Sequence, residues 1–259
     1  MAALTQGDLH VQAAVPVMEI RQFHMKVQAN AHPAFYLEGM LSEEAGEEGI
    51  RIPLSGTTVR IGAGDRLLFT GILEEAEVVQ EGRGYEIIMR GAAATRLLDC
   101  RKKARSFQDV SMTYRQVMEQ VLADTPGAGL DLHVEDRVIG RPLYQLEETD
   151  WGFLKRLAGH LGTAIMPSVY PVAAQIHVGQ PAGRSITAGT GTEKERSWYD
   201  RDAGGLCISV RTWEDWEPGD EVCMEGRVLS VKTKECRLEK GLLQFYYTLA
   251  DQPGLYADR

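Results

Sequence analysis

Four glutamates, Glu43, Glu44, Glu47 and Glu48, form a dense group of carboxylates within the stretch SEEAGEEG at 42–49. A pair of such side chains could act as acid and base, as the hydrolysis of a glycosidic bond requires. The stretch is polar and contains two glycines, so little that is apolar lies nearby to raise a carboxyl pKa. We therefore interpret 42–49 as a solvated, turn-rich loop and keep glycan hydrolysis as an alternative.

A second group that could do chemistry is aromatic and consists of Trp198, Tyr199, Trp213 and Trp216. Such rings could form a platform on which sugars stack, which would indicate a glycan-binding module. Aromatic side chains also fill cores and protein interfaces, where they bury large apolar areas. We favour the second interpretation and keep the glycan-binding module as a further alternative.

The common motifs for metals, nucleotides and nucleophiles do not occur in this sequence. No two histidines are three or four positions apart and no two cysteines are closely spaced, so a helical metal pair or zinc knuckle is not indicated. Gly62-Ala63-Gly64 lies in a β pattern, and Ser55 lacks the glycine two positions earlier that a nucleophile elbow needs. We predict no catalytic, cofactor-binding or metal-binding residue. The residues considered are His10, His24, His32, His133, His160, His177, Cys100, Cys207, Cys223 and Cys236.

The chain has 259 residues and a formal net charge of −9. This acidic balance argues against a protein that holds nucleic acid by neutralising its phosphates. The first residues, MAALTQGDLHVQ, lack the basic and apolar segments of a signal peptide. No apolar run approaches the roughly 20 residues that a membrane span needs. We expect a protein made in the cytoplasm, with reduced cysteines, no membrane insertion and no direct nucleic-acid binding.

The strongest cluster of positive charge consists of Arg101, Lys102, Lys103 and Arg105. It lies in a stretch that we interpret as a connector between a β region and a helix. Two interpretations remain open: a solvated connector, or an electrostatic contact with an acidic partner surface such as that of a neighbouring subunit.

Two helices are predicted near the middle of the chain. Thr113 and Gln116 form a capping box, after which apolar residues recur at helical spacing. The stretch LYQLEETDWGFLKRLAGHLG at 143–162 predicts an extended start, an acidic turn and an amphipathic helix. Thr149 is the expected N-cap, and Gly162 suits the left-handed C′ position.

Regions of β pattern flank these helices. Alternating apolar and polar residues predict strands from about Val15 to Asp99 and again from Thr163 onward. Residues 1–14 are expected to form a loosely held arm. The Gly- and Thr-rich stretch 183–196 is expected to be a long loop.

The two β regions share a short sequence skeleton. Gly64-Asp65 is followed by Gly71 and two strands, and Gly219-Asp220 is followed by Gly226 and two strands. A period this long, used twice, indicates a duplicated domain. Three chains with two similar units each would present six similar units around an axis, which can match a sixfold partner and a threefold one.

Two elements of the central region resemble the pattern of a known family. The first, Arg105-Ser106-Phe107-Gln108-Asp109, is similar to an SR-x-FQD element with the Arg and Ser transposed. The second resembles Y-x-E-[ST]-D-x-x-F-L-x-R-L…G and consists of Tyr144, Glu148, Thr149, Asp150, Phe153, Leu154, Arg156, Leu157 and Gly162. The order of the elements and the surrounding β pattern resemble hub proteins of contractile injection systems. These include the VgrG proteins of type VI secretion and the late control protein D family of contractile phage tails.

The resemblance implies a mainly β fold with an α insertion (α+β). Two similar tube-type β-barrel domains would flank a small helical middle domain. The expected divisions are an N-terminal barrel at 1–108, the middle domain at 109–165 and a C-terminal barrel at 166–259. The family has no active site or cofactor in this part, so the resemblance implies a structural protein and not an enzyme.

The implied function is that of a baseplate hub, a homotrimeric ring that joins the hexameric tail tube to the trimeric central spike of a virion or phage-like particle. The implied partners are the tail tube protein, the central spike protein, and other baseplate or tape-measure proteins. Strands within Arg66–Arg90 and Glu221–Asp251 are expected to make the ring and tube contacts. VgrG-like chains continue into an OB-fold and a spike, whereas this sequence stops at Arg259, so we expect a separate spike or a truncated sequence. A tail-associated cell-wall hydrolase and a glycan-binding module remain the alternatives.

Overall fold

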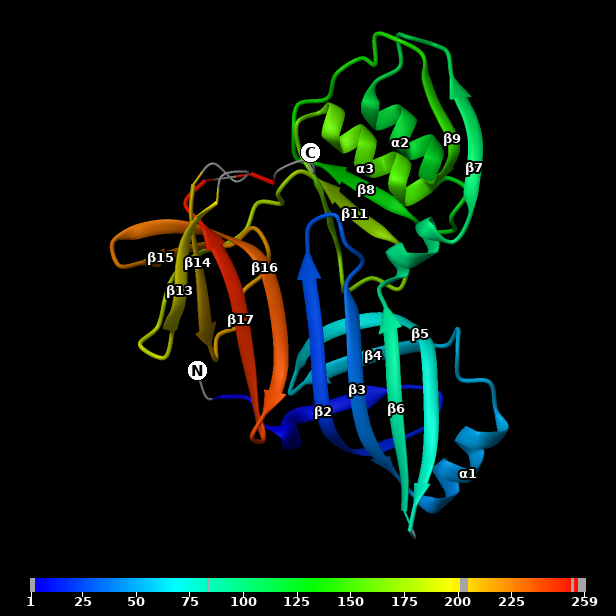
Figure 1. Cartoon of the computed structure of the whole chain (residues 1–259), viewed down its shortest axis with the longest axis vertical. Helices are drawn as coiled ribbons and strands as arrows, with labels where there is room; N and C mark the ends of the chain where they lie inside the picture. Colours follow the sequence, from blue (N-terminus) through cyan, green and yellow to red (C-terminus); the bar gives the residue numbers. More distant parts are fainter. Residues whose placement is uncertain (1–2, 83, 201–204, 253, 256–259) are drawn as a thin grey trace.

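The computed structural model of the chain describes residues 3–82, 84–200, 205–252 and 254–255. Strands dominate these residues and helices are few, so the fold is mainly β with an α insertion, as predicted. Figure 1 shows two groups of strands side by side, one blue to cyan and one yellow to red, with a green helical unit above them. No helix in the described ranges has both the length and the apolar character needed to cross a membrane.

The first group of strands has one packed face. In β3 (Ala34–Leu41), Phe35, Leu37 and Leu41 are buried and alternate with less buried neighbours, as expected where one face of a strand meets the core. The order across this part of the sheet is β1-β4-β5-β6-β3-β2. The other bounds are β1 (Leu9–Gln12), β2 (Val17–Gln28), β4 (Thr58–Ala63), β5 (Arg66–Glu81) and β6 (Gly84–Ala92).

The second group follows the same principle. In β17 (Leu242–Ala250), the predicted alternation is confirmed, because Leu243, Phe245 and Tyr247 are buried between half-buried residues. The order is β15-β16-β17-β14-β13, with β12 pairing to β15. The other bounds are β12 (Ser185–Thr187), β13 (Glu193–Asp200), β14 (Gly205–Thr212), β15 (Glu221–Met224) and β16 (Arg227–Glu239).

The two groups repeat one topology. Each has a hairpin, β2–β3 or β13–β14, followed by a meander, β4–β5–β6 or β15–β16–β17, whose last strand pairs with the second hairpin strand. The long strands β5 and β16 also share an irregularity of register. It begins at Leu73, eight residues before Glu81, and at Val231, eight residues before Glu239. The duplication is therefore present in the strand order and in the position of the bulge.

The glycine spacing aligned the two halves of the repeat at Gly64-Asp65 and Gly219-Asp220. This alignment is wrong, because it does not match equivalent residues. The turn at Gly64-Asp65 joins β4 to β5, and its structural equivalent is the β15–β16 turn at Glu225-Gly226. Glu225 and Gly226 both have positive φ angles, of 52° and 75°. The sequence spacing matched Gly64 with Gly219 and Gly71 with Gly226. In the structure Gly219 precedes β15 and Gly71 lies inside β5, so neither match is correct.

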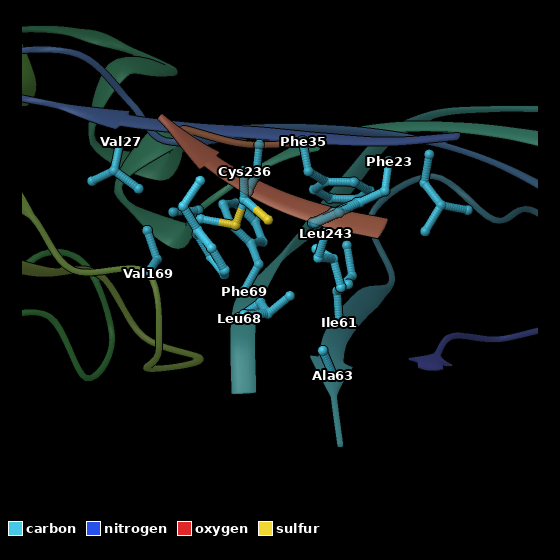
Figure 2. Packing of buried hydrophobic residues seen from close by; sticks show 14 of the residues in the cluster. Phe23, Val27, Phe35, Ile61, Ala63, Leu68, Phe69, Val169, Cys236 and Leu243 are labelled. Atoms are coloured by element: carbon cyan, nitrogen blue, oxygen red, sulfur yellow. The ribbon is translucent and has the colours of Figure 1, made fainter. Parts of the chain in front are cut away.

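Strands β2 and β16 join the two groups into one sheet. They pair antiparallel, from Gln28 opposite Thr233 to His24 opposite Arg237. One hydrophobic core extends beneath both groups, and Figure 2 shows Phe23 and Phe35 of the first group near Leu243 of the second. The two groups are thus continuous in hydrogen bonding and in packing.

The N-terminal residues also connect the two groups, so the prediction of a loosely held arm is wrong. Strand β1 pairs with β4, and the Gly64 amide donates to the Asp8 carbonyl at 2.9 Å. The Gln6 amide donates to the carbonyl of Gly241 at 2.8 Å, in the turn between β16 and β17. Backbone pairing with distant strands, which short-range pattern does not reveal, holds this segment in place.

The middle unit has a core of its own, formed by residues between Ala94 and Val178. In Figure 1, α2 and α3 lie between the β7–β9 ribbon and the strands β8 and β11. The bounds are η2 (Ala94–Asp99), β7 (Lys102–Phe107), α2 (Tyr114–Leu122), β8 (Gly129–Leu132), β9 (Leu143–Thr149), α3 (Asp150–His160), β10 (Ile165–Pro167) and β11 (Gln175–Val178).

The predicted helix ends in this unit are confirmed. The Thr113 hydroxyl accepts from the Gln116 amide while the Gln116 side chain accepts from the Thr113 amide, which completes a capping box. The Thr149 hydroxyl accepts from the Gly152 amide at 3.1 Å. Gly162, just beyond α3, has φ +75°, the left-handed conformation expected at this position.

Three further segments predicted to be irregular are regular. The acidic stretch forms α1 (Glu43–Arg51), whose N-cap Ser42 accepts from the Ala45 amide. The basic connector is strand β7, which pairs with β9, and much of 183–196 belongs to β12 and β13. Their side chains are largely polar because one face meets water, so hydrophobicity alone did not reveal them.

Candidate functional site

Asp150, the aspartate of the second sequence element, lies at the centre of a buried polar cluster. Its side chain is 3% exposed, and its position at the start of α3 also suits a negative charge. Its Oδ1 accepts hydrogen bonds from Arg105 Nη1 at 2.7 Å and from Gln145 Nε2 at 2.9 Å. Its Oδ2 accepts from Lys103 Nζ at 2.7 Å. Because the two bases lie on β7 and Gln145 on β9, one carboxylate ties the ribbon to the helix.

Asp124, just after α2, binds the same two bases. Lys103 Nζ donates to Asp124 Oδ2 at 3.0 Å, and Arg105 Nη2 donates to the same oxygen. These hydrogen bonds lower the pKa of the Asp124 carboxyl. We call Lys103, Arg105, Asp124, Gln145 and Asp150 the motif cluster. With two cations and two carboxylates it is balanced in charge, which offsets the cost of removing the charges from water.

A second ion pair fixes the turn before α3. Arg156 Nη2 donates to Glu148 Oε2 at 2.7 Å and to the Tyr144 carbonyl at 2.6 Å. The Arg156 guanidinium carbon lies 4.8 Å from the centre of the Phe153 ring. These four residues all belong to the element that resembles the family pattern, so the pattern corresponds to contacts within the chain.

The motif cluster is suited to holding elements together and not to acid–base chemistry. A general acid near neutral pH needs a raised carboxyl pKa, whereas the two bases lower that of Asp124. Asp150 is saturated by three donors and is buried. The cluster therefore positions β7, β9 and α3 relative to one another.

The basic run 101–105 is now divided between two roles. Lys103 and Arg105 point into the motif cluster, so they are neither a solvated connector nor a contact for another subunit. Arg101 and Lys102 are exposed. Contact with an acidic partner stays a prediction for these two residues alone.

The acidic group Glu43, Glu44, Glu47 and Glu48 lies on exposed positions of α1. Glu47 Oε2 is 3.3 Å from Nη2 of Arg51, four positions later on the helix. The buried side of α1 consists of Ala45, Gly46 and Gly49. The glutamates therefore form a solvated helix face, which gives no observation in favour of hydrolysis.

The aromatic group does not form one platform. Trp216 is 1% exposed and stacks on Tyr247 with ring centres 4.8 Å apart, whereas Tyr199 is 72% exposed on β13. The Tyr247 hydroxyl accepts from the Trp216 amide at 2.7 Å. Trp216 is thus a core residue, and an exposed Tyr199 indicates a surface that another molecule could cover.

His133 and His177 are 44 positions apart in the sequence, but the fold brings their side chains together. His133 Nε2 and His177 Nδ1 are 3.0 Å apart, because β8 and β11 pair in parallel and place Asp131 opposite His177. No group of three or more His, Cys, Asp or Glu side chains among the described residues could hold a metal ion. Only the strand pairing, which the sequence does not show, could have revealed this pair.

A buried lysine marks the junction between the two strand groups. Lys234 lies opposite Val27 in the β2–β16 pairing, and its side chain is fully buried. Its Nζ is 2.6 Å from Asp215 Oδ1 and 2.5 Å from Glu217 Oε1. Burial opposes the charge, but these carboxylates outweigh it and raise the pKa of Lys234 well above its ordinary value. These ion pairs tie β16 to the segment between β14 and β15 within the second strand group, beside the junction with β2.

Solved structures of tail proteins share this fold. One is an E. coli component of the type VI secretion system, described as similar in structure to the T4 bacteriophage tail proteins gp27 and gp5. It superposes with a TM-score of 0.73 at 12% identity, over 97% of this chain and 77% of that one. A tail protein from Neisseria meningitidis gives a TM-score of 0.70 at 13% identity, over 96% and 97% of the two chains. The 43 kDa tail protein of prophage MuSo2 from Shewanella oneidensis gives 0.70 at 13%, over 93% and 97%.

No curated protein matches the sequence. The profile of one family, described as phage tail baseplate hub (GPD), matches residues 22–167. This range is more than half of the chain, begins in β2, ends with β10 and contains the whole motif cluster. The chain therefore belongs to the phage tail baseplate hub family.

Proposed function

We propose that the chain is a structural baseplate hub that forms a homotrimeric ring and joins a hexameric tail tube to a trimeric central spike. The observation that supports this is the duplicated strand order, β4-β5-β6-β3-β2 and β15-β16-β17-β14-β13, placed side by side through β2–β16. Three chains would supply six similar units around an axis. Such a ring can match sixfold symmetry on one face while keeping threefold symmetry as a whole.

The division into three parts, predicted at 1–108, 109–165 and 166–259, is part of this proposal, with the middle part taken to include the residues of its own core between Ala94 and Val178. A feature that occurs twice per chain appears six times in a trimer, and one that occurs once appears three times. The strand groups are of the first kind, and the middle unit, which has its own core, is of the second. We assign the strand groups to the tube and the middle unit to the spike and other baseplate or tape-measure proteins.

The expected contact strands fit this assignment. Arg66–Arg90 covers β5 and most of β6. Glu221–Asp251 covers β15 and also β16 and β17, which are the equivalents of β5 and β6 in the repeat. In Figure 1 the C-terminal ends of β5 and β16 lie at the end of the molecule away from the middle unit. Equivalent turns on one side would give the tube six similar contacts.

The proposed hub acts by geometry and not by catalysis. In the motif cluster, Lys103 and Arg105 donate hydrogen bonds to both carboxylates. The chain would be made in the bacterial cytoplasm and assembled there into the baseplate of a virion or phage-like particle.

The experiment that tests the proposal is the solution mass of the purified chain, measured by light scattering over a range of concentrations, alone and with the tube and spike proteins. A mass near three times 28.7 kDa is expected. Electron microscopy of that species should show a hollow ring with threefold symmetry. A chain that stays monomeric even with both partners present would overturn the trimer.

A further inference from the structure

Two histidine side chains of the middle unit face each other across paired strands. His133 Nε2 and His177 Nδ1 are 3.0 Å apart, and the planes of the two rings are inclined by 44°. In its neutral form each imidazole has one nitrogen with a free lone pair, which can bind a proton or a transition-metal ion. Neither the motif cluster nor the strand pairing of the proposed hub uses these two nitrogens.

The backbone fixes the separation of the two histidines. Strand β11 pairs in parallel with β8 and places His177 opposite Asp131. The His133 amide continues this pairing, because it donates to the Val178 carbonyl at 2.9 Å. Asp131 and His133 are two positions apart, so extended backbone directs both side chains to the face that carries His177. The hydrogen bonds of the sheet therefore hold the pair in place.

The face of the sheet that carries the histidines is turned away from the core of the middle unit. Ile176 and Val178 belong to that core, and His177 alternates with them to the opposite face. His133 is exposed, and the side chain of His177 is 24% exposed. His177 also lines a cavity of about 450 Å³. Water and dissolved ions can therefore reach both rings.

The distance between the two nitrogens suits a shared metal ion. A histidine nitrogen lies about 2.0–2.1 Å from a bound Zn²⁺ ion. Two such bonds that meet at a right angle, as in tetragonal coordination, place their nitrogens about 2.9 Å apart, and a tetrahedral angle places them about 3.3 Å apart. The observed 3.0 Å lies between these values. A rotation of the exposed His133 ring would direct both lone pairs at one ion.

We propose that His133 and His177 form a binding site for a divalent transition-metal ion and bind Cu²⁺ more tightly than Ni²⁺ or Zn²⁺. Imidazole is a ligand for all three ions, and the affinity of a nitrogen site is highest for Cu²⁺. No third His, Cys, Asp or Glu side chain in the described ranges completes the set, so water supplies the remaining ligands. The ion would connect β8 to β11, two strands of the middle unit that are far apart in the chain.

Asp131 adds negative charge beside this site. Its Oδ2 lies 3.6 Å from His177 Nδ1 and accepts a hydrogen bond from Gln175 Nε2 at 3.4 Å. A carboxylate at this distance attracts a cation, and it can accept a hydrogen bond from a water molecule that the ion binds. Asp131 therefore supports the site by charge, whereas the two histidines bind the ion.

Metal titration of the full chain, purified without a polyhistidine tag, tests the site. Isothermal titration calorimetry with the chlorides of Cu²⁺, Ni²⁺ and Zn²⁺ should show a stoichiometry of about one ion per chain and the tightest binding for Cu²⁺. Electron paramagnetic resonance of the Cu²⁺ form should show coupling to two nitrogens. The ion should also raise the urea midpoint of unfolding, because it binds the folded state.

Variants assign the binding to the two histidines. His133→Gln and His177→Gln should each weaken Cu²⁺ binding about tenfold or more and remove one nitrogen coupling, with circular dichroism to check the fold. Asp131→Asn should keep both couplings and weaken binding less.

His10→Gln is the matched control and should leave binding unchanged, because His10 is also exposed but lies on β1 in the first strand group. Cu²⁺ binding that neither variant of the pair weakens, or no binding of any of the three ions at micromolar concentrations, would overturn the site. The site does not depend on the trimer, so either result would leave the hub proposal standing.

Discussion

Arg105 and Asp150 are 45 positions apart in the chain, yet Nη1 of the arginine donates to Oδ1 of the aspartate at 2.7 Å. Each residue belongs to one of the two sequence elements that resemble the hub family pattern. The pattern therefore describes two sides of one buried ion cluster. Its residues hold β7, β9 and α3 of the middle unit together.

Replacing Asp150 with Ala should destabilise the protein strongly. The change leaves the half-buried Lys103 and Arg105 with only the exposed Asp124 as a carboxylate partner. Breaking a buried ion pair from one side costs about 3–5 kcal/mol, and urea unfolding followed by circular dichroism measures this free energy. Asp124→Ala is the matched control, because it removes an exposed carboxylate from the same two bases and should cost much less. Equal losses for the two variants would contradict the central role of Asp150.

Replacing Gly46 with Ala should destabilise the protein although alanine is the better helix former. The new Cβ would lie 2.1 Å from Cγ of the Tyr85 ring, so α1 or the ring must move. Overpacking of this kind costs about 1–3 kcal/mol, measurable by thermal or urea unfolding. Gly49→Ala, whose Cβ would lie 3.1 Å from a Val78 methyl, should have a smaller effect. A Gly46→Ala protein as stable as the parent would show that α1 is not packed on Tyr85.

Replacement by Met should be far more costly at Lys234 than at Lys232, which also lies on β16. Lys234→Met leaves Asp215 and Glu217 without their cation and should cost about 3–5 kcal/mol. Lys232 has no ion pair in the described part of the chain, and burial lowers its pKa to about 8. Its Nζ donates to Gln180 Oε1 at 2.6 Å. Lys232→Met should therefore cost far less or stabilise the fold, and unfolding curves at pH 7 compare the two. A larger loss of stability for Lys232→Met than for Lys234→Met would contradict the role assigned to the Lys234 ion pairs.

Stability should fall as the pH falls below about 6.5, and His32 should contribute to this loss. Burial lowers the pKa of His32 from its ordinary value of 6.5, despite the opposing charge of Asp99. In acid the unfolded chain then binds a proton more readily than the folded chain, so His32 favours folding above pH 6.5 and opposes it below. Its ring lies 4.3 Å from Trp151 and its Nδ1 is 3.1 Å from Thr95 Oγ1. His32→Gln should reduce the difference between the urea midpoints at pH 7.5 and pH 5; an unchanged difference would contradict the assignment.

The sequence was informative wherever the determining contacts are local. The capping box at Thr113, the N-cap at Thr149, the terminal glycine of α3 and the alternation in β17 depend on residues within a few positions, and each is confirmed. The strands β1, β7 and β13 depend on distant partners and carry polar residues, so their patterns resembled loops. Helix α1 was missed because its two glycines, which made the stretch resemble a loop, serve packing against Tyr85 and Val78.

The candidate sites show the same division. The elements that resemble the hub family were visible in sequence, but the sequence did not show that Lys103 and Arg105 turn inward to Asp150. The duplication was detected, yet its register was not, because the equivalent turns at 64–65 and 225–226 differ in the position of the glycine. Strand order and bulge position determine that register, and both are properties of the folded sheet.

The hydrogen bond from Gln6 to Gly241 also sets the order in which a newly made chain can finish folding. Residue 6 is synthesised early, but its hydrogen bond cannot form until the turn between β16 and β17 has left the ribosome. Until then β2 has no β16 to pair with, and the first half carries an open strand edge. Contacts so distant in sequence form slowly. The edge of β2 therefore stays exposed for as long as the synthesis of the second strand group takes.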